Sequence, residues 1–63
     1  MTAEELRQLS AAELAAKEKE MREHLFRLRF QLAAGQMESV KKIRELRKDI
    51  ARLATVRREQ ERS

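Results

Sequence analysis

Basic side chains recur at helical spacing in the last third of this sequence. They are Lys41, Arg44, Lys48, Arg52 and Arg62, with Thr55 and Arg58 close to the same line, and we call this set the basic stripe. On a helix these residues share one face, and at 1.5 Å per residue the stripe spans roughly 30 Å. A row of cations of that length can follow several phosphates of a folded nucleic acid.

The alternative interpretation is a solvated helix face whose cations are balanced by acids one turn away. Glu45 and Asp49 supply two such acids, but both lie off the line of the stripe. The spacing therefore favours phosphate binding.

Other kinds of chemistry have little support in the sequence. The one histidine, His24, has Glu20 four residues before it, and a single His/Glu pair is too few ligands for a metal site. There is no cysteine, no nucleophile paired with a base, and no glycine-rich phosphate loop. We expect no metal, no cofactor, no small-molecule substrate and no enzymatic activity.

Composition points to a basic, helical chain. Of its 63 residues, 41% are charged and 3% are aromatic, and there is one glycine and no proline. Residues 1–23 carry six acids and four bases, whereas residues 24–63 carry five acids and eleven bases, which favours a polyanionic partner for the second part. Without cysteines, a basic leader or a long apolar run, we expect a cytoplasmic protein with no signal peptide and no membrane segment.

Three helices are predicted. Thr2 with Glu5, and Ser10 with Glu13, fit capping boxes, which start one helix over about 3–8 and a second over about 11–34. Gly35 then ends the second helix, because the residue after a helix often adopts a left-handed conformation that disfavours a Cβ. A short loop leads to a third helix over about 39–60.

Apolar residues form one stripe on each long helix, at alternating spacings of three and four. The second helix carries Leu14, Met21, Leu25, Leu28 and Leu32, with Glu18 in the same line, and the third carries Ile43, Leu46, Ile50 and Leu53. Two stripes joined by a short loop predict an all-α fold, an antiparallel two-helix hairpin that forms a single domain over residues 1–63.

Phe26 and Phe30 point away from the apolar stripe of their helix. Either the short first helix folds back and shields them with Leu6 and Leu9, or they form an interface with another macromolecule. Stacking on RNA bases is a third possibility.

Three stretches together resemble the large-subunit ribosomal protein 29 family. They are "ELRQLSAAEL" at 5–14, "LRFQLAAGQ" at 28–36 and "IRELRKDIARLAT" at 43–55, in the order and at the spacing of that family. The resemblance covers nearly the whole chain. It implies a structural protein of the cytoplasmic ribosome that binds large-subunit rRNA near the mouth of the peptide exit tunnel, as a monomer beside the neighbouring ribosomal protein 23.

The resemblance also implies which residues meet RNA. The polar signature of the family falls on Arg7, Arg29, Gln31, Gln36, Arg44, Arg47, Lys48, Arg52 and Thr55. Lys41 and Arg58 join this set from the basic stripe, and the two lines of reasoning overlap on the third helix. The competing hypothesis is a coiled-coil interaction module that self-associates through its apolar stripes and carries the basic face incidentally.

Overall fold

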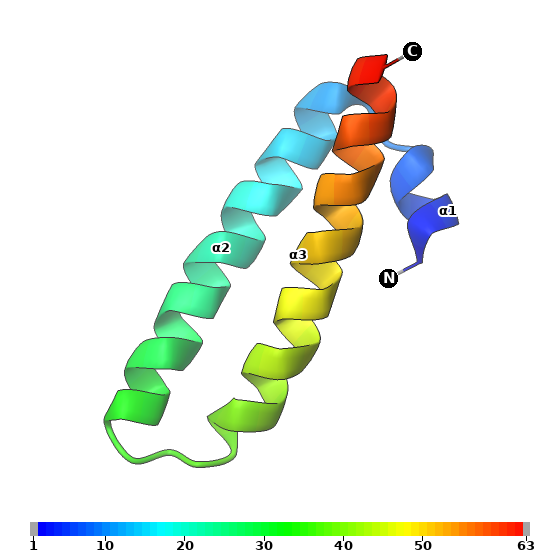
Figure 1. Ribbon diagram of the computed structural model, residues 1–63. Coiled ribbons are helices and arrows are strands. Elements are labelled where there is room, and N and C mark those ends of the chain that lie inside the picture. Colours follow the sequence, from blue (N-terminus) through cyan, green and yellow to red (C-terminus); the bar gives the residue numbers. More distant parts are fainter. Residues whose placement is uncertain (1, 63) are drawn as a thin grey trace.

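The computed structural model describes residues 2–62, which form three helices and a rod about 44 Å long (Figure 1). Helix α1 spans Ala3–Arg7, α2 spans Ala11–Ala33 and α3 spans Ser39–Arg62. The long helices α2 and α3 pack along one another in antiparallel directions. The predicted all-α hairpin is confirmed, and its helix ends lie within two residues of those expected from the sequence.

The helix starts follow the predicted caps. The Ser10 hydroxyl accepts from the Glu13 backbone N–H, and the Glu13 carboxylate accepts from the Ser10 backbone N–H, so this capping box is complete. At α1, the Thr2 hydroxyl accepts from the Glu5 N–H at 3.3 Å, but the return bond from the Thr2 backbone is absent among residues 2–62. The two helices therefore begin at separate capping residues, and Ser10 marks the end of the break between α1 and α2.

Helix α2 ends in a Schellman motif at Gly35. The Gln36 N–H donates to the Gln31 carbonyl at 3.1 Å, and the Gly35 N–H donates to the Leu32 carbonyl at 3.0 Å. Gly35 has φ +97°, the left-handed conformation that this motif requires. The glycine predicted to end the helix has that role.

The core lies between the two long helices. Its buried residues on α2 and α3 are Leu14, Met21, Leu25, Leu28, Ile50, Leu53 and Val56. Ile43 and Leu46 pack against this core but stay half-buried towards the loop. Val56 extends the apolar stripe of α3 by one turn, because the helix continues to Arg62 and does not fray earlier.

An ion pair joins the two long helices at the one charged position of the α2 stripe. Glu18 Oε2 lies 3.2 Å from Arg57 Nη1 on α3 and 3.4 Å from Arg22 Nε on α2. The Glu18 carboxylate is tolerated in the apolar stripe because it pairs with these two cations at the edge of the core.

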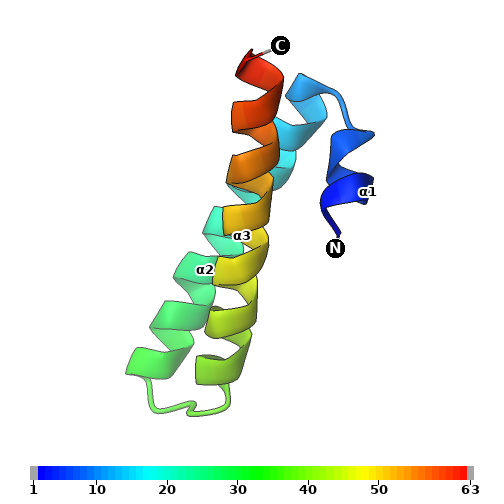
Figure 2. The same ribbon diagram turned by 45° about the vertical axis from the view of Figure 1, so that its right-hand side comes forward.

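Helix α1 packs beside the C-terminal half of α3, and Figure 2 shows it lying alongside that helix. Leu6 is buried in the same cluster as Leu14, Leu53 and Val56, and Leu9 packs against its edge. The possibility that Leu6 and Leu9 shield Phe26 and Phe30 is therefore wrong. The apolar side of this short helix is used against α3, so it cannot also cover the outer face of α2.

Candidate nucleic-acid interface

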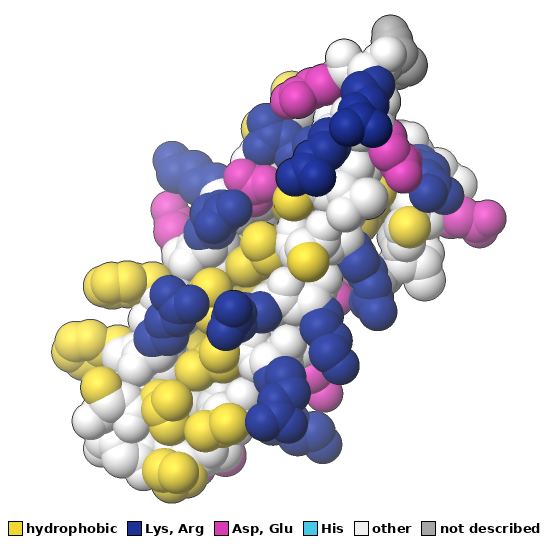
Figure 3. Space-filling model, viewed as in Figure 1, with side chains coloured by type: hydrophobic (Ala, Val, Ile, Leu, Met, Phe, Trp, Pro, Cys, Tyr) yellow, Lys and Arg dark blue, Asp and Glu magenta, His cyan; other side chains and the backbone are white. Residues whose placement is uncertain are grey.

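The basic stripe lies along the solvent face of α3. All seven of its members are exposed, because Ile43, Leu46, Ile50 and Leu53 turn the opposite face of the helix towards α2. Lys and Arg side chains follow α3 from the loop end towards the C-terminal end in Figure 3. The helix therefore presents cations over most of its length.

Most of the stripe carries uncompensated charge. Within residues 2–62, no ion pair involves Lys41, Arg44, Lys48, Arg58 or Arg62. Anionic groups held by these side chains would not have to displace a protein carboxylate. This is the electrostatic arrangement expected of a phosphate-binding surface.

Two members of the stripe have partners within α3. Arg52 Nη1 lies 3.4 Å from Asp49 Oδ1, so an acid that was expected to lie off the stripe does reach it. The Thr55 hydroxyl donates to the Ala51 carbonyl at 3.0 Å, which uses the proton that a phosphate oxygen would accept. Arg52 and Thr55 are thus less open to a phosphate than the other members.

A shallow groove near the loop end combines cations with apolar side chains. It is lined by Val40, Ile43, Arg44, Arg47 and Lys48. Arg47, predicted from the family signature but outside the basic stripe, is exposed beside it. The groove therefore has charged surface for the phosphates of a nucleic-acid backbone and apolar surface for its sugars.

The remaining residues of the predicted set lie at other places. Arg29 is exposed on α2, and Gln36 is exposed in the loop. The Gln31 side-chain oxygen accepts from the Ser39 hydroxyl at 3.4 Å, which ties the end of α2 to the start of α3. Ser39 is buried, so this bond satisfies a polar group inside the turn and gives Gln31 a structural role that periodicity did not indicate.

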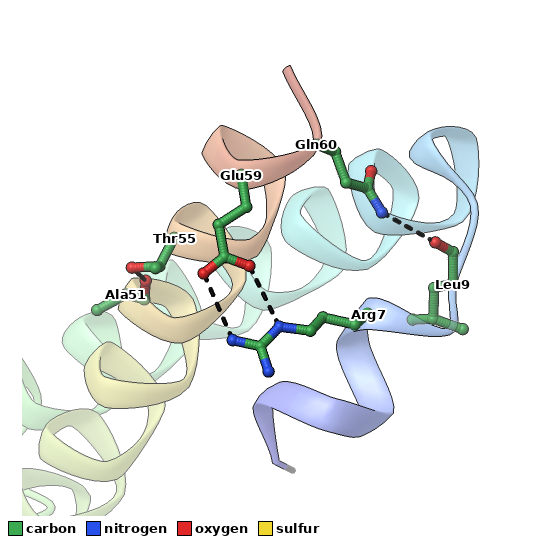
Figure 4. A network of polar contacts seen from close by, with 6 residues as sticks. All are labelled: Arg7, Leu9, Ala51, Thr55, Glu59 and Gln60. Carbon is green, nitrogen blue, oxygen red and sulfur yellow. Dashed lines mark hydrogen bonds and ion pairs between the residues drawn. The ribbon is translucent and has the colours of Figure 1, made fainter. Parts of the chain in front are cut away.

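Arg7 is held away from the middle of the stripe, at the far end of α3. Its Nε lies 3.2 Å from Glu59 Oε2 and its Nη2 lies 3.4 Å from Glu59 Oε1 (Figure 4). The hydrogen bond to Glu59 and the attraction of that carboxylate raise the pKa of Arg7 above its ordinary value. Sequence reasoning missed Glu59, because the pair joins residues of two helices that only the tertiary fold brings together.

Phe26 and Phe30 form an exposed aromatic pair on α2, with 70% and 71% of their surfaces open to solvent. Both side chains line one shallow groove with Arg27 and Gln31, and a second groove runs from Phe26 and Arg27 along α2 towards Ala15. Two large apolar side chains one turn apart, left open by the fold, are typical of a contact surface for another macromolecule.

Other classes of site find no support in the part of the chain that the structure describes. No group of three or more His, Cys, Asp or Glu side chains there could hold a metal ion, and His24 lies exposed on α2. None of the helices in residues 2–62 is long and apolar enough to span a membrane.

A basic helical hairpin with one cationic face is a form that nucleic-acid-binding proteins take, and comparison with known proteins identifies the family. The model of the family described as "Ribosomal L29 protein" matches residues 4–60. The "Large ribosomal subunit protein uL29" of Geobacillus stearothermophilus is 54% identical over 61 residues, which cover 97% of this chain and 92% of that protein. The protein of the same name from Enterococcus faecalis is 53% identical over 60 residues, 95% of this chain and 97% of the relative.

This chain belongs to the ribosomal L29 protein family. The match covers the whole of α2, most of α1 and α3, the loop with Gly35, and every member of the basic stripe except Arg62. The resemblance drawn from the three sequence stretches is confirmed.

Proposed function

We propose that this protein is a structural, non-enzymatic component of the large subunit of the cytoplasmic ribosome, and that it holds large-subunit rRNA through the basic face of α3. Membership of the ribosomal L29 family supports the place of the protein in the ribosome, since relatives that are 50% or more identical carry the name of a large-subunit protein. The observation that carries the RNA contact is the set of exposed cations on α3 that have no acidic partner in residues 2–62.

The contact is made to the RNA backbone. An RNA duplex has a major groove too narrow for a helix, so an α-helix meets phosphates and 2′-hydroxyls and does not read bases there. Lys41, Arg44 and Lys48 follow one another on an exposed face, and the groove beside Arg47 adds apolar surface for sugars. Affinity then comes from charge, and the fit comes from the shape of the RNA.

The aromatic pair on α2 is the second contact surface. We assign Phe26 and Phe30 to a protein neighbour, since they are exposed on a different helix from the stripe and are not covered by α1. The family resemblance supports ribosomal protein 23 as that neighbour and the mouth of the peptide exit tunnel as the location. Gln36 stays a predicted RNA contact, because Gly35 beside it lets a backbone approach closely.

Self-association through the apolar stripes has less support. The stripes of α2 and α3 are packed against one another within a single chain, so they are not available to a second copy over most of their length. A monomer in the ribosome agrees with this packing.

Binding of the full chain to purified large-subunit rRNA tests the proposed RNA contact. The variant Arg44→Glu with Lys48→Glu reverses two charges. It removes no core contact because both side chains are exposed, and it should keep the helix because Glu is a good helix former. The matched control is Lys17→Glu with Lys19→Glu, which makes the same change of net charge on α2, two turns or more from the aromatic pair.

We expect the α3 variant to lose at least about tenfold in affinity, and its dependence of log affinity on log salt to flatten by about one unit for each lost phosphate contact. The α2 control should keep an affinity within a few-fold of the unmodified chain. Equal losses in the two variants, with helicity intact, would show that only net charge matters and would reject α3 as the RNA-binding face.

A further inference from the structure

One acid lies on the line of the basic stripe. Glu59 is four residues after Thr55 and three before Arg62, so it lies on the same helix face as the cations of the stripe, directly after Arg58. Its side chain is 47% exposed. A bare carboxylate at this point would repel an RNA backbone that follows α3 towards its C-terminal end.

Arg7 covers this carboxylate. Both Glu59 oxygens accept from the same guanidinium, at 3.2 Å from Nε and 3.4 Å from Nη2, which is the paired geometry in which Arg neutralises a carboxylate (Figure 4). The two N–H groups of Arg7 that donate to Glu59 are not directed at RNA.

The fold builds this pairing. Leu6, next to Arg7 in the sequence, is 1% exposed in the core formed with Leu53 and Val56 of α3. The Gln60 side-chain amide donates to the Leu9 carbonyl at 3.2 Å and fastens the other end of the same segment. Helix α1 therefore carries a cation to the acid that lies among the last cations of the stripe.

We infer that Arg7 is a positioning residue that supports RNA binding by neutralising Glu59, and that it does not itself contact a phosphate. This inference rests on the proposed function of the α3 face. In this role α1 covers Glu59, and the cationic surface of α3 then continues as far as Arg62.

A double-mutant cycle on the full chain tests the inference, with purified large-subunit rRNA as the probe. The four proteins are the unmodified chain, Arg7→Ala, Glu59→Gln, and the variant with both changes. Arg7→Ala should weaken binding about three- to tenfold at low salt, since it uncovers one negative charge near several phosphates. The variant with both changes should bind within about twofold of Glu59→Gln alone, because the repelling charge is then gone.

The salt dependence separates the two roles of Arg7. If Arg7 only covers Glu59, adding Arg7→Ala to Glu59→Gln changes neither the affinity nor the slope of log affinity against log salt, because no phosphate contact is lost and no carboxylate is uncovered. A direct contact predicts an equal loss with and without Glu59→Gln and a slope flatter by about one unit. That result would overturn the inference and leave the proposed function intact.

Two further variants separate charge from docking of α1. Arg7→Lys keeps the cation and should keep most of the affinity, whereas Gln60→Ala removes the other polar contact of this segment without uncovering Glu59 and should bind as the unmodified chain does. A loss in Gln60→Ala as large as that in Arg7→Ala would show that docking of α1 matters and not the charge of Glu59, which overturns the inference. If the unmodified chain shows no salt-dependent binding at all, the proposed function and the inference fall together.

Discussion

At the scale of single residues, Gly35 takes a conformation that any other residue of this chain would resist. It is the only residue among 2–62 with a φ in the left-handed region, at +97°. A Cβ built on it would meet nothing within 4 Å, so the reason for glycine is backbone conformation and not lack of space.

Replacing Gly35 should therefore cost stability through the backbone alone. We expect Gly35→Val to lower the free energy of unfolding by about 1 to 2 kcal/mol, because a β-branched side chain is a poor fit for positive φ. The control is Ala34→Val, at an exposed neighbour with φ −84°, which should cost clearly less. Urea unfolding followed by circular dichroism measures both, and equal losses would mean that Gly35 is not needed for the end of α2.

The aromatic pair makes a separate prediction. Phe30→Asp should leave the free energy of unfolding within about 0.5 kcal/mol, because the side chain is 71% exposed and makes no part of the core. It should weaken binding to ribosomal protein 23 while the affinity for rRNA stays within a few-fold. Titration of the variant with each partner in turn measures this, and a large loss of RNA affinity with helicity intact would move Phe30 into the RNA interface.

At the scale of elements, the helices were predictable because the signals that begin and end them are local. Ser10 with Glu13 start α2, Gly35 ends it, and the spacing of Ile43, Leu46 and Ile50 defines the buried side of α3. The faces of the long helices followed from the same periodicity. These features need only neighbours within a few residues along the chain.

The contacts between elements were not predictable in the same way. The side on which α1 docks, and the pairs Arg7 with Glu59 and Glu18 with Arg57, depend on how three helices sit in space. The sequence of α1 did not show which surface Leu6 would cover. Only packing decides that it is buried against Leu53 and Val56 and leaves the phenylalanines open.

Docking of α1 can be tested through its buried leucine. A helix of five residues does not persist alone in water, so Leu6→Ala should abolish the helical Cα chemical shifts of residues 3–7. The halves of α2 and α3 next to the loop should keep their helical chemical shifts, because Leu25 and Leu28 pack away from α1. Leu9→Ala, at the half-buried edge, is the milder control. Helical shifts that persist in α1 of the Leu6 variant would contradict this account of its stability.

At the scale of the whole molecule, the chain has a thin core. Two long helices and one short one bury only eight apolar residues among 2–62, and chains of this size gain little net stability from burial. The proposed contact with rRNA would add stability that this small core does not supply.

The isolated chain should therefore unfold readily and gain stability from RNA. We expect a broad thermal transition of the free protein below about 70 °C, and a midpoint that rises when large-subunit rRNA is added, since a ligand that binds only the folded chain stabilises it. Melting curves by circular dichroism with and without RNA measure the shift. A sharp transition at higher temperature that RNA does not move would contradict the predicted marginal stability.

Co-sedimentation with ribosomal subunits in sucrose gradients tests whether this protein is a large-subunit component held by the basic face of α3. Tagged versions of the unmodified chain, of Arg44→Glu with Lys48→Glu, and of the control Lys17→Glu with Lys19→Glu are compared after washes of rising salt. We expect the unmodified chain and the α2 control to sediment with the large subunit and not with the small one, and the α3 variant to be released at lower salt or never to join the large subunit. If all three sediment alike, α3 does not hold the protein in place, and if none sediments with the large subunit, the proposed function is wrong.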